Sequence, residues 1–225
     1  MRQHHRRFLF LAGLATTLLS TTAHANLLVN GGFEDPPLTA VYAAYGQGQS
    51  IGGWLVFGSG FSSAAQLTLR ADYQEYAGTL SFSPHGGLVS LDMTGSGNLG
   101  ANGVTQTIAT TAGAAMALSF WVGNQDAAFG GYMLASSVEV FVDSVSIGVF
   151  SNADNSNADV NWKQFQVGFV AASPSTTIAF VNATPSGDNM AGLDDVVLTE
   201  IPEPTTALLL GLALTGLLPL RRRTR

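Results

Sequence analysis

The feature that most constrains the fold of this chain is an apolar alternation with a period of two residues. It runs through residues 138–142, 145–149 and 165–169, where valine, isoleucine or phenylalanine occupies every second position. Such alternation is typical of antiparallel strands with one buried face, whereas an amphipathic helix repeats about every 3.6 residues. Residues 26–199 also hold 23 of the 26 glycines, a density that predicts many turns. We therefore predict an all-β domain.

Short apolar runs and the turn residues between them predict about ten strands in an antiparallel β-sandwich. Asp143-Ser144 reads as a tight hairpin turn. Helix-forming residues leave a short helix open as an alternative over residues 64–77, and residues 35–50 lack any periodicity and are expected to form a loop. The expected strands cover residues 26–30, 53–57, 66–70, 87–93, 103–110, 115–123, 137–142, 145–150, 162–171 and 176–183, with a closing strand near 193–199.

The N-terminus has the three parts of a secretory signal peptide. Arg2, Arg6 and Arg7 form a basic region, residues 8–19 are apolar, and Ala23-His24-Ala25 is a small-x-small cleavage site. Cleavage between Ala25 and Asn26 is therefore expected, with export through the Sec translocon.

The C-terminus combines a proline elbow, an apolar segment and a basic end. Pro202-Glu203-Pro204 precedes the uncharged residues 205–220, which predict a short membrane helix, and residues 221–225 hold four arginines expected on the cytoplasmic side. This order resembles the PEP-CTERM sorting signal of Gram-negative bacteria. The resemblance implies recognition by an exosortase, with processing near the motif, in a host that makes exopolysaccharide or biofilm matrix. A plain membrane anchor is the alternative.

Composition excludes several classes of function for the ectodomain, residues 26–199. It has 2 basic and 13 acidic residues, a net charge of 2 − 13 = −11, which is the wrong sign for nucleic-acid binding. There is no cysteine, so disulfides, thiolate catalysis and cysteine-zinc sites are excluded. An acidic exported domain suits calcium, neutral glycans or solubility alone.

Both ends of the ectodomain carry a recognisable pattern. It opens with residues 26–34, Asn-Leu-Leu-Val-Asn-Gly-Gly-Phe-Glu, and closes with residues 192–198, Gly-Leu-Asp-Asp-Val-Val-Leu. With residues 104–108, residues 117–120 and the Trp162 strand, this set resembles galactose-binding-like jelly rolls, in particular carbohydrate-binding modules. The resemblance implies a jelly-roll β-sandwich with a structural calcium held by the Gly32 carbonyl, Glu34 and Asp194, and Asp195 on the other strand face.

The chemistry of that calcium site is reasonable, because calcium prefers six to eight hard oxygen ligands. Two carboxylates from opposite chain ends would repel each other unless a cation joined them. The alternative is that Glu34 and Asp194 are solvated acids in turns.

A sugar site is expected where an aromatic ring meets polar neighbours. Met116, Leu118 and Phe120 share one face of a strand, so Trp121 lies on the opposite, outer face. The alternative is that Trp121 packs beneath the following loop, and Trp54 and Trp162 read as core or loop-pinning residues. The candidate ligand-binding residues are Trp121, Asn124, Asp126 and Tyr132, with Gln125 and Phe129 beside them.

No catalytic residue is predicted. The ectodomain holds one histidine, His85, and no Gly-x-Ser-x-Gly motif accompanies it. Residues 95–100 match the dinucleotide-binding spacing, but a strand pattern follows instead of a helix. A pair of acids suited to glycoside hydrolysis is not excluded.

The sequence thus predicts an exported, exosortase-sorted β-sandwich on the cell surface or in the extracellular matrix, binding polysaccharide. The alternatives are a purely structural matrix protein and, less favoured, a glycoside hydrolase.

Overall fold

The computed structural model describes residues 25–58, 67–72, 74–95, 98, 101–125, 127, 132, 135–154, 159–187 and 190–202. Within them lie fourteen β-strands, one 3-10 turn and no α-helix. The elements are β1 (Tyr42–Tyr45), β2 (Ser50–Ile51), β3 (Trp54–Phe57), β4 (Leu67–Ala71), β5 (Gln74–Glu75), η1 (Tyr76–Gly78), β6 (Leu80–Ser81), β7 (Val89–Asp92), β8 (Gly103–Ala109), β9 (Ala115–Asn124), β10 (Ser136–Val142), β11 (Val145–Asn152), β12 (Asn161–Val170), β13 (Ser175–Asn182) and β14 (Gly192–Glu200).

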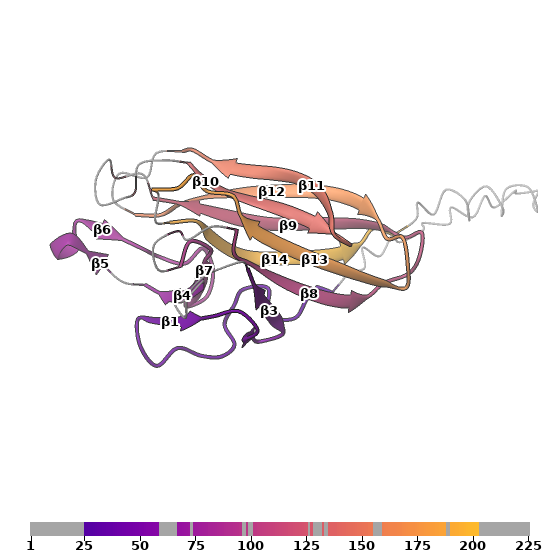
Figure 1. The fold of residues 1–225 in the computed structure, drawn as a ribbon, viewed down its shortest axis with the longest axis horizontal. Coiled ribbons are helices and arrows are strands. Elements are labelled where there is room, and N and C mark those ends of the chain that lie inside the picture. Colours follow the sequence, from indigo (N-terminus) through magenta and orange to yellow (C-terminus); the bar gives the residue numbers. More distant parts are fainter. Residues whose placement is uncertain are drawn as a thin grey trace, which may run out of the picture.

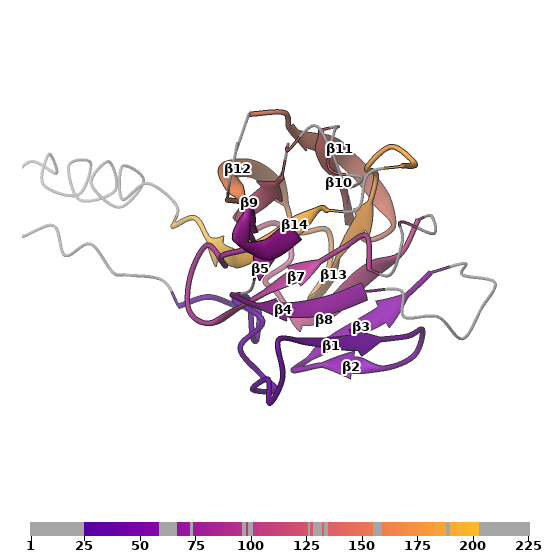
Figure 2. The same ribbon diagram turned by 90° about the vertical axis from the view of Figure 1, so that its left-hand side faces the viewer.

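Two six-stranded antiparallel sheets form the sandwich, and β5 and β6 form a separate hairpin (Figures 1 and 2). Sheet A has the strand order β1-β4-β7-β14-β9-β12, and sheet B has the order β11-β10-β13-β8-β3-β2. From β7 onward the chain passes to the other sheet at every step except the β10–β11 hairpin. This topology is a jelly roll, so the predicted fold class is confirmed.

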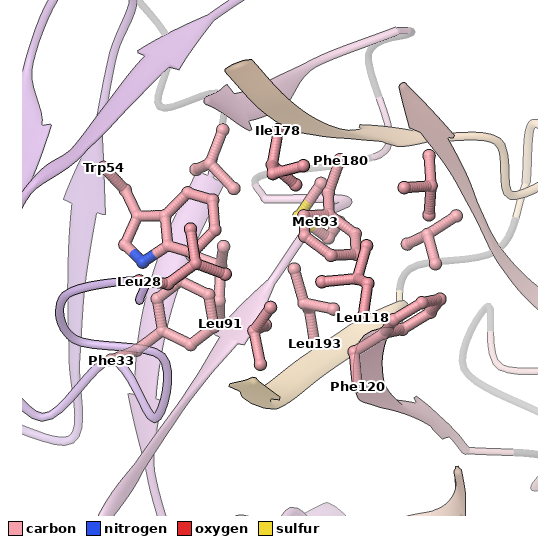
Figure 3. Close-up of a cluster of buried hydrophobic side chains, with 14 of the residues drawn as sticks. Leu28, Phe33, Trp54, Leu91, Met93, Leu118, Phe120, Ile178, Phe180 and Leu193 are labelled. Carbon is pink, nitrogen blue, oxygen red and sulfur yellow. The ribbon is translucent and has the colours of Figure 1, made fainter. Parts of the chain in front are cut away.

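The main core lies between the two sheets and receives every second residue of the long strands. Phe120 of β9 packs edge-on against Phe180 of β13, with ring centroids 5.0 Å apart, and Phe180 meets Trp54 of β3 at 6.0 Å. Figure 3 shows these rings beside aliphatic side chains from both sheets. Trp54 is fully buried and its Nε1 donates to the Asn30 carbonyl, so its predicted core role is confirmed.

A smaller hydrophobic cluster lies apart from the main core. It consists of Leu80, Phe82, Tyr132 and Met190, with Ala127 and Val160 packed against it. The Phe82 and Tyr132 ring centroids are 5.3 Å apart, and the Tyr132 hydroxyl donates to Glu75 Oε2 at 2.9 Å. This cluster holds the β5–β6 hairpin, which projects at the left-hand end in Figure 1.

The first predicted strand, residues 26–30, is the clearest difference from expectation. These residues form bends, because the Gln106 side chain satisfies the backbone hydrogen bonds of Val29. Val29 N donates to Gln106 Oε1 at 2.7 Å, and Gln106 Nε2 donates to Val29 O at 3.0 Å. Residues 35–50, expected to be a loop, contain β1 and the start of β2. Over residues 64–77 the described part forms β4, β5 and the start of η1 rather than an α-helix.

The predicted targeting segments lie mostly outside the described residues. Ala25 and Asn26 are described, as is Pro202, whereas Glu203, Pro204 and the predicted membrane helix 205–220 are not. Within the described ranges, no helix is long and apolar enough to cross a membrane.

Candidate functional site

The structure brings the three predicted calcium ligands together where the two ends of the domain meet. Gly32 follows the N-terminal segment, Glu34 comes two residues later, and Asp194 lies on β14. A Cβ atom placed on Gly32 would lie 3.9 Å from both Asp194 Oδ1 and Glu34 Cγ, and 3.4 Å from Asp195 Oδ1. Carboxylate oxygens of Asp194 and Asp195 and the Cγ of Glu34 therefore lie beside Gly32; we call Glu34, Asp194 and Asp195 the acidic cluster.

Residues 85–89 wrap over this cluster and donate backbone hydrogen bonds to it. Asp194 Oδ2 accepts from the N–H groups of His85 at 3.0 Å and Gly86 at 3.1 Å. Glu34 Oε1 accepts from Leu88 at 2.8 Å and Val89 at 3.0 Å. A Cβ on Gly87 would clash with Glu34 Oε1, so glycine is needed for this close approach.

Asp194 is completely buried, whereas Asp195 is partly exposed. Burial raises the pKa of the Asp194 carboxyl from the usual 3.8 to about 7, against the lowering effect of the three backbone donors from Gly86, Asp195 and His85. Among the described side chains, His85 is the basic group that contacts the cluster, with Nδ1 2.7 Å from Asp195 Oδ2. The cluster therefore carries more negative charge than its described neighbours balance.

A cation held by this acidic cluster would be calcium rather than a transition metal, because the nearby donors are carboxylate and carbonyl oxygens. Among the described residues, no group of three or more His, Asp or Glu side chains is arranged to hold a metal ion. A cation here would take oxygens from Glu34, Asp194 and backbone carbonyls such as that of Gly32. Calcium accepts such mixed oxygen ligands, whereas zinc sites are built from histidine, cysteine and carboxylate side chains.

Trp121 lies beside the acidic cluster on the outer face of sheet A, as its strand phase predicted. The His85 ring stacks on its indole, with centroids 3.7 Å apart and planes 20° from parallel. One face of Trp121 is therefore covered by His85 of the 82–88 segment, which is not the following loop that the alternative named. Trp162 lies edge-on to His85 at 6.0 Å, and its Nε1 donates to the Ser83 carbonyl, so it pins the same segment.

The structure does not bring Asn124 and Tyr132 to the surface beside Trp121. Asn124 is 1% exposed; its Oδ1 accepts from Ser136 N and Oγ, and its Nδ2 donates to Asp154 O. Tyr132 is 4% exposed within the small cluster. Gln125 is buried, and Asp126 and Phe129 lie outside the described residues. A glycan at the surface would reach neither Asn124 nor Tyr132.

A groove that sequence reasoning missed crosses the outer face of sheet B. It has a volume of about 350 Å³. The paired residues Thr105 of β8 and Ala179 of β13 lie in it, and Ala179 is paired in turn with Phe141 of β10. Phe57, at the end of β3, lies over Gly103 on the opposite side. The complete lining is Phe57, Thr105, Phe141, Ser144, Thr177, Ala179 and Val181.

The groove combines two aromatic rings with an apolar floor and hydroxyl groups. Thr177 Oγ1 shares a hydrogen bond of 2.8 Å with Thr107 Oγ1, and Thr105 Oγ1 donates to the Ile178 carbonyl at 3.1 Å. Each hydroxyl oxygen keeps a lone pair to offer a ligand. From β3 to β10 the groove spans three interstrand spacings, roughly 14 Å, the length of a short oligosaccharide.

No protein-family model and no curated protein matches this sequence. Solved structures show similarity at low identity. A family 61 carbohydrate-binding module, TmCBM61, in complex with β-1,4-galactotriose has a TM-score of 0.44 and 14% identity, covering 79% of this chain and 99% of that chain. The CBM22-1 xylan-binding domain of Paenibacillus barcinonensis Xyn10C has a TM-score of 0.42 and 15% identity, covering 81% and 98%.

A third similar structure is the enzymatically active domain of bacteriophage CBA120 tailspike protein 4, with a TM-score of 0.46 and 14% identity. The match covers 78% of this chain but only 21% of the tailspike chain. These sugars and activities are properties of those proteins. The jelly-roll assignment of this chain rests on the strand order and pairing described above.

Proposed function

We propose that this protein is an exported β-sandwich that binds polysaccharide through the groove on sheet B. The observation that carries the proposal is the pair of phenylalanine rings, Phe57 and Phe141, on either side of an apolar groove with hydroxyl groups. Aromatic rings contact the apolar faces of sugars, while hydroxyls contact their polar edges. The ectodomain charge of −11 favours a neutral or basic polysaccharide over an acidic one.

The groove replaces the Trp121 patch as the preferred site because, among the described residues, no aromatic ring stacks on Phe57 or Phe141 as His85 does on Trp121. The His85 ring already occupies one face of Trp121, and two of the three ligand-binding residues predicted beside it, Asn124 and Tyr132, are buried. Substitution of Trp121 still tests the alternative site on sheet A. A sugar there could stack only on the indole face that His85 leaves uncovered.

Retention on immobilised polysaccharides tests the proposal. Phe57→Ala and Phe141→Ala should each weaken retention by about tenfold or more, as removal of a central aromatic anchor does, while the melting temperature changes little because both rings lie outside the core. Trp121→Ala is the matched aromatic control and should retain wild-type binding. Loss of retention with Trp121→Ala alone would move the site to the sheet A surface.

Two other results would point to different functions. If no polysaccharide in a broad panel is retained by a protein shown to be folded, a purely structural role in the matrix is favoured. Release of reducing ends from any glycan would indicate a hydrolase and contradict a binding-only role.

Export and sorting form a second part of the proposal. The predicted mature N-terminus, Asn26, already belongs to the fold: its Nδ2 donates to the Val196 carbonyl at 2.8 Å. The folded domain extends to Ile201, whose N–H donates to the Ala115 carbonyl, immediately before Pro202. Mass spectrometry of protein from the cell envelope should therefore find Asn26 at the N-terminus and no residues beyond the motif. Recovery of intact Arg225 would favour anchoring over processing.

A calcium ion is the third part of the proposal. Glu34, Asp194 and the Gly32 carbonyl would hold it, and it would neutralise the acidic cluster and join the two ends of a disulfide-free domain. Glycan retention that is unchanged by chelator, together with a melting temperature that falls, would assign calcium to stability rather than to ligand contact.

A further inference from the structure

Among the strands that the structure describes, those of sheet B contain a single charged residue, Glu139 of β10. The strands β2, β3, β8, β11 and β13 contain no lysine, arginine, histidine, aspartate or glutamate. The basic residues of the ectodomain are Arg70 on β4 and Lys163 on β12, both in sheet A, and His85, whose ring stacks on a β9 side chain. No cation on a strand of sheet B therefore balances the Glu139 carboxylate.

Strand pairing places Glu139 on the groove face of this sheet. Glu139 is directly opposite Val181 of β13, which lines the groove, and directly opposed residues of an antiparallel pair lie on the same face. Phe141, two residues further along β10, lines the groove as well. The alternate residues Val138 and Val140 are fully buried, so the Glu139 side chain lies on the outer face, at the β10 end of the groove.

One oxygen of the Glu139 carboxylate is available to a ligand. Ser146 of β11 donates its hydroxyl to Oε1 at 2.5 Å, which holds the carboxylate in place. Oε2 accepts no hydrogen bond from the residues that the structure describes. The side chain is half-buried, so water and salt screen its charge less than they screen that of a fully solvated carboxylate.

The sugar that best matches this carboxylate carries a positive charge. An acidic sugar would bring a second negative charge close to Glu139 and to a domain of net charge −11. A neutral sugar would offer Oε2 only a hydroxyl, whereas a protonated amine offers a hydrogen bond and an ion pair together. A hexosamine that lacks its N-acetyl group combines this amine with an apolar ring face that can contact Phe57 or Phe141.

We propose that the groove binds a polysaccharide that contains free amino sugars, and that Glu139 is the residue that selects the amine. This inference rests on the proposed glycan-binding function of the groove, to which it adds the ligand class and a specificity-determining residue. The two phenylalanine rings contact any sugar in the groove, and Glu139 decides which sugar is preferred.

Two oligosaccharides that differ only in acetylation test the inference on the full-length protein. The probes are a β-1,4-linked glucosamine hexamer and the same hexamer with every amine acetylated, and calorimetry gives the Kd of each. The wild type should bind the free-amine hexamer roughly fivefold more tightly, as expected for a partly shielded ion pair, and the preference should shrink at about 0.5 M salt. Glu139→Gln keeps the shape of the side chain and should bring the two Kd values within about twofold of each other.

Glu200→Gln is the matched control, because it removes the same charge from β14 of sheet A. This variant should keep the wild-type preference for the free-amine hexamer, whereas Glu139→Lys should abolish it. Phe57→Ala should weaken the binding of both hexamers, which separates ring contact from selection of the amine. A preference that persists in Glu139→Gln, or that Glu200→Gln removes as well, would overturn the role of Glu139.

The outcomes also separate this inference from the proposed function. If the acetylated hexamer or a neutral polysaccharide binds in a manner that depends on Phe57, and the free-amine hexamer binds no more tightly, the groove is a glycan site without amine selection and this inference alone fails. If a protein shown to be folded binds neither hexamer and no neutral polysaccharide, the proposed function fails with it.

Discussion

Asp194 is a carboxyl group buried where the two ends of the domain meet, and its ionisation opposes folding. Its pKa is about 7 in the folded protein against 3.8 when exposed. A pKa raised by folding contributes stability that is fully present below about pH 4 and is lost as the pH rises through 7. We expect the metal-free protein to lose up to about 4 kcal/mol from this group between these limits, which urea denaturation across that range can measure.

Asp194→Asn isolates this contribution because the amide does not titrate. When calcium is removed by chelator, the wild type should lose unfolding free energy relative to Asp194→Asn as the pH rises from 4 to 8. A difference that stays constant from pH 4 to pH 8 would show that Asp194 ionises freely.

At neutral pH, calcium should make the ionised Asp194 carboxylate stabilise the fold instead of destabilising it. If Glu34 and Asp194 hold the ion, calcium favours their ionised forms and stabilises the wild type but not Asp194→Asn. The measurement is the melting temperature at pH 7.5 with chelator and with calcium. Identical melting temperatures for the wild type in the two conditions would remove the proposed site.

The sequence predicted the convergence of Gly32, Glu34 and Asp194 because a resemblance linked the two chain ends. It could not predict that His85 stacks on Trp121, because that contact depends on where residues 82–88 cross sheet A. The groove could not be predicted from the sequence either. Phe57 and Phe141 are far apart in sequence, and only the strand order β10-β13-β8-β3 places them across one groove.

The β5–β6 hairpin depends on Tyr132 for its attachment. Tyr132 packs on Phe82, and its hydroxyl bonds Glu75 of β5. Tyr132→Ala should lower the free energy of opening this hairpin by about 3 kcal/mol, as truncation of a buried aromatic does, and hydrogen exchange of the β5 and β6 amides should report it. The main core is separate, so exchange in β9 and β13 should change little.

Tyr132→Phe provides the control within the same element. It keeps the ring and removes one hydrogen bond, so its cost should be about 1 kcal/mol. If Tyr132→Ala instead abolished polysaccharide retention with no effect on hairpin exchange, the ligand-binding role predicted from the sequence would be correct.

Elements with strong alternation were predicted to within a few residues, and weakly patterned ones were not. Strands β8 to β14 are long, and their inward residues fill one core, so the period of two was visible. β1 was missed because Tyr-Ala-Ala-Tyr shows no alternation and its pairing partner, β4, decides its conformation. Residues 26–30 were predicted to form a strand and do not, because the distant Gln106 side chain replaces strand pairing at Val29.

The whole domain is closed by contact between its first and last segments rather than by a disulfide. Leu27 N donates to the Leu198 carbonyl at 2.9 Å, and Val196 N donates to the Gly31 carbonyl at 2.9 Å. β14 lies between β7 and β9 inside sheet A, so the N-terminal segment is fastened to an interior strand. Global stability should therefore respond to changes at a terminus that would otherwise fray.

Asn26 tests this closure, since its side chain makes two of the contacts with β14. Its Nδ2 donates to the Val196 carbonyl at 2.8 Å, and its Oδ1 accepts from Leu198 N at 2.9 Å. Asn26→Ala should lower the global free energy of unfolding by about 1–2 kcal/mol, as the loss of two partly buried hydrogen bonds does. Asn26→Asp keeps the acceptor for Leu198 and loses the donor to Val196, so its urea midpoint should lie between those of the other two proteins. A midpoint for Asn26→Ala equal to the wild type would mean that the N-terminal segment opens independently of the sandwich.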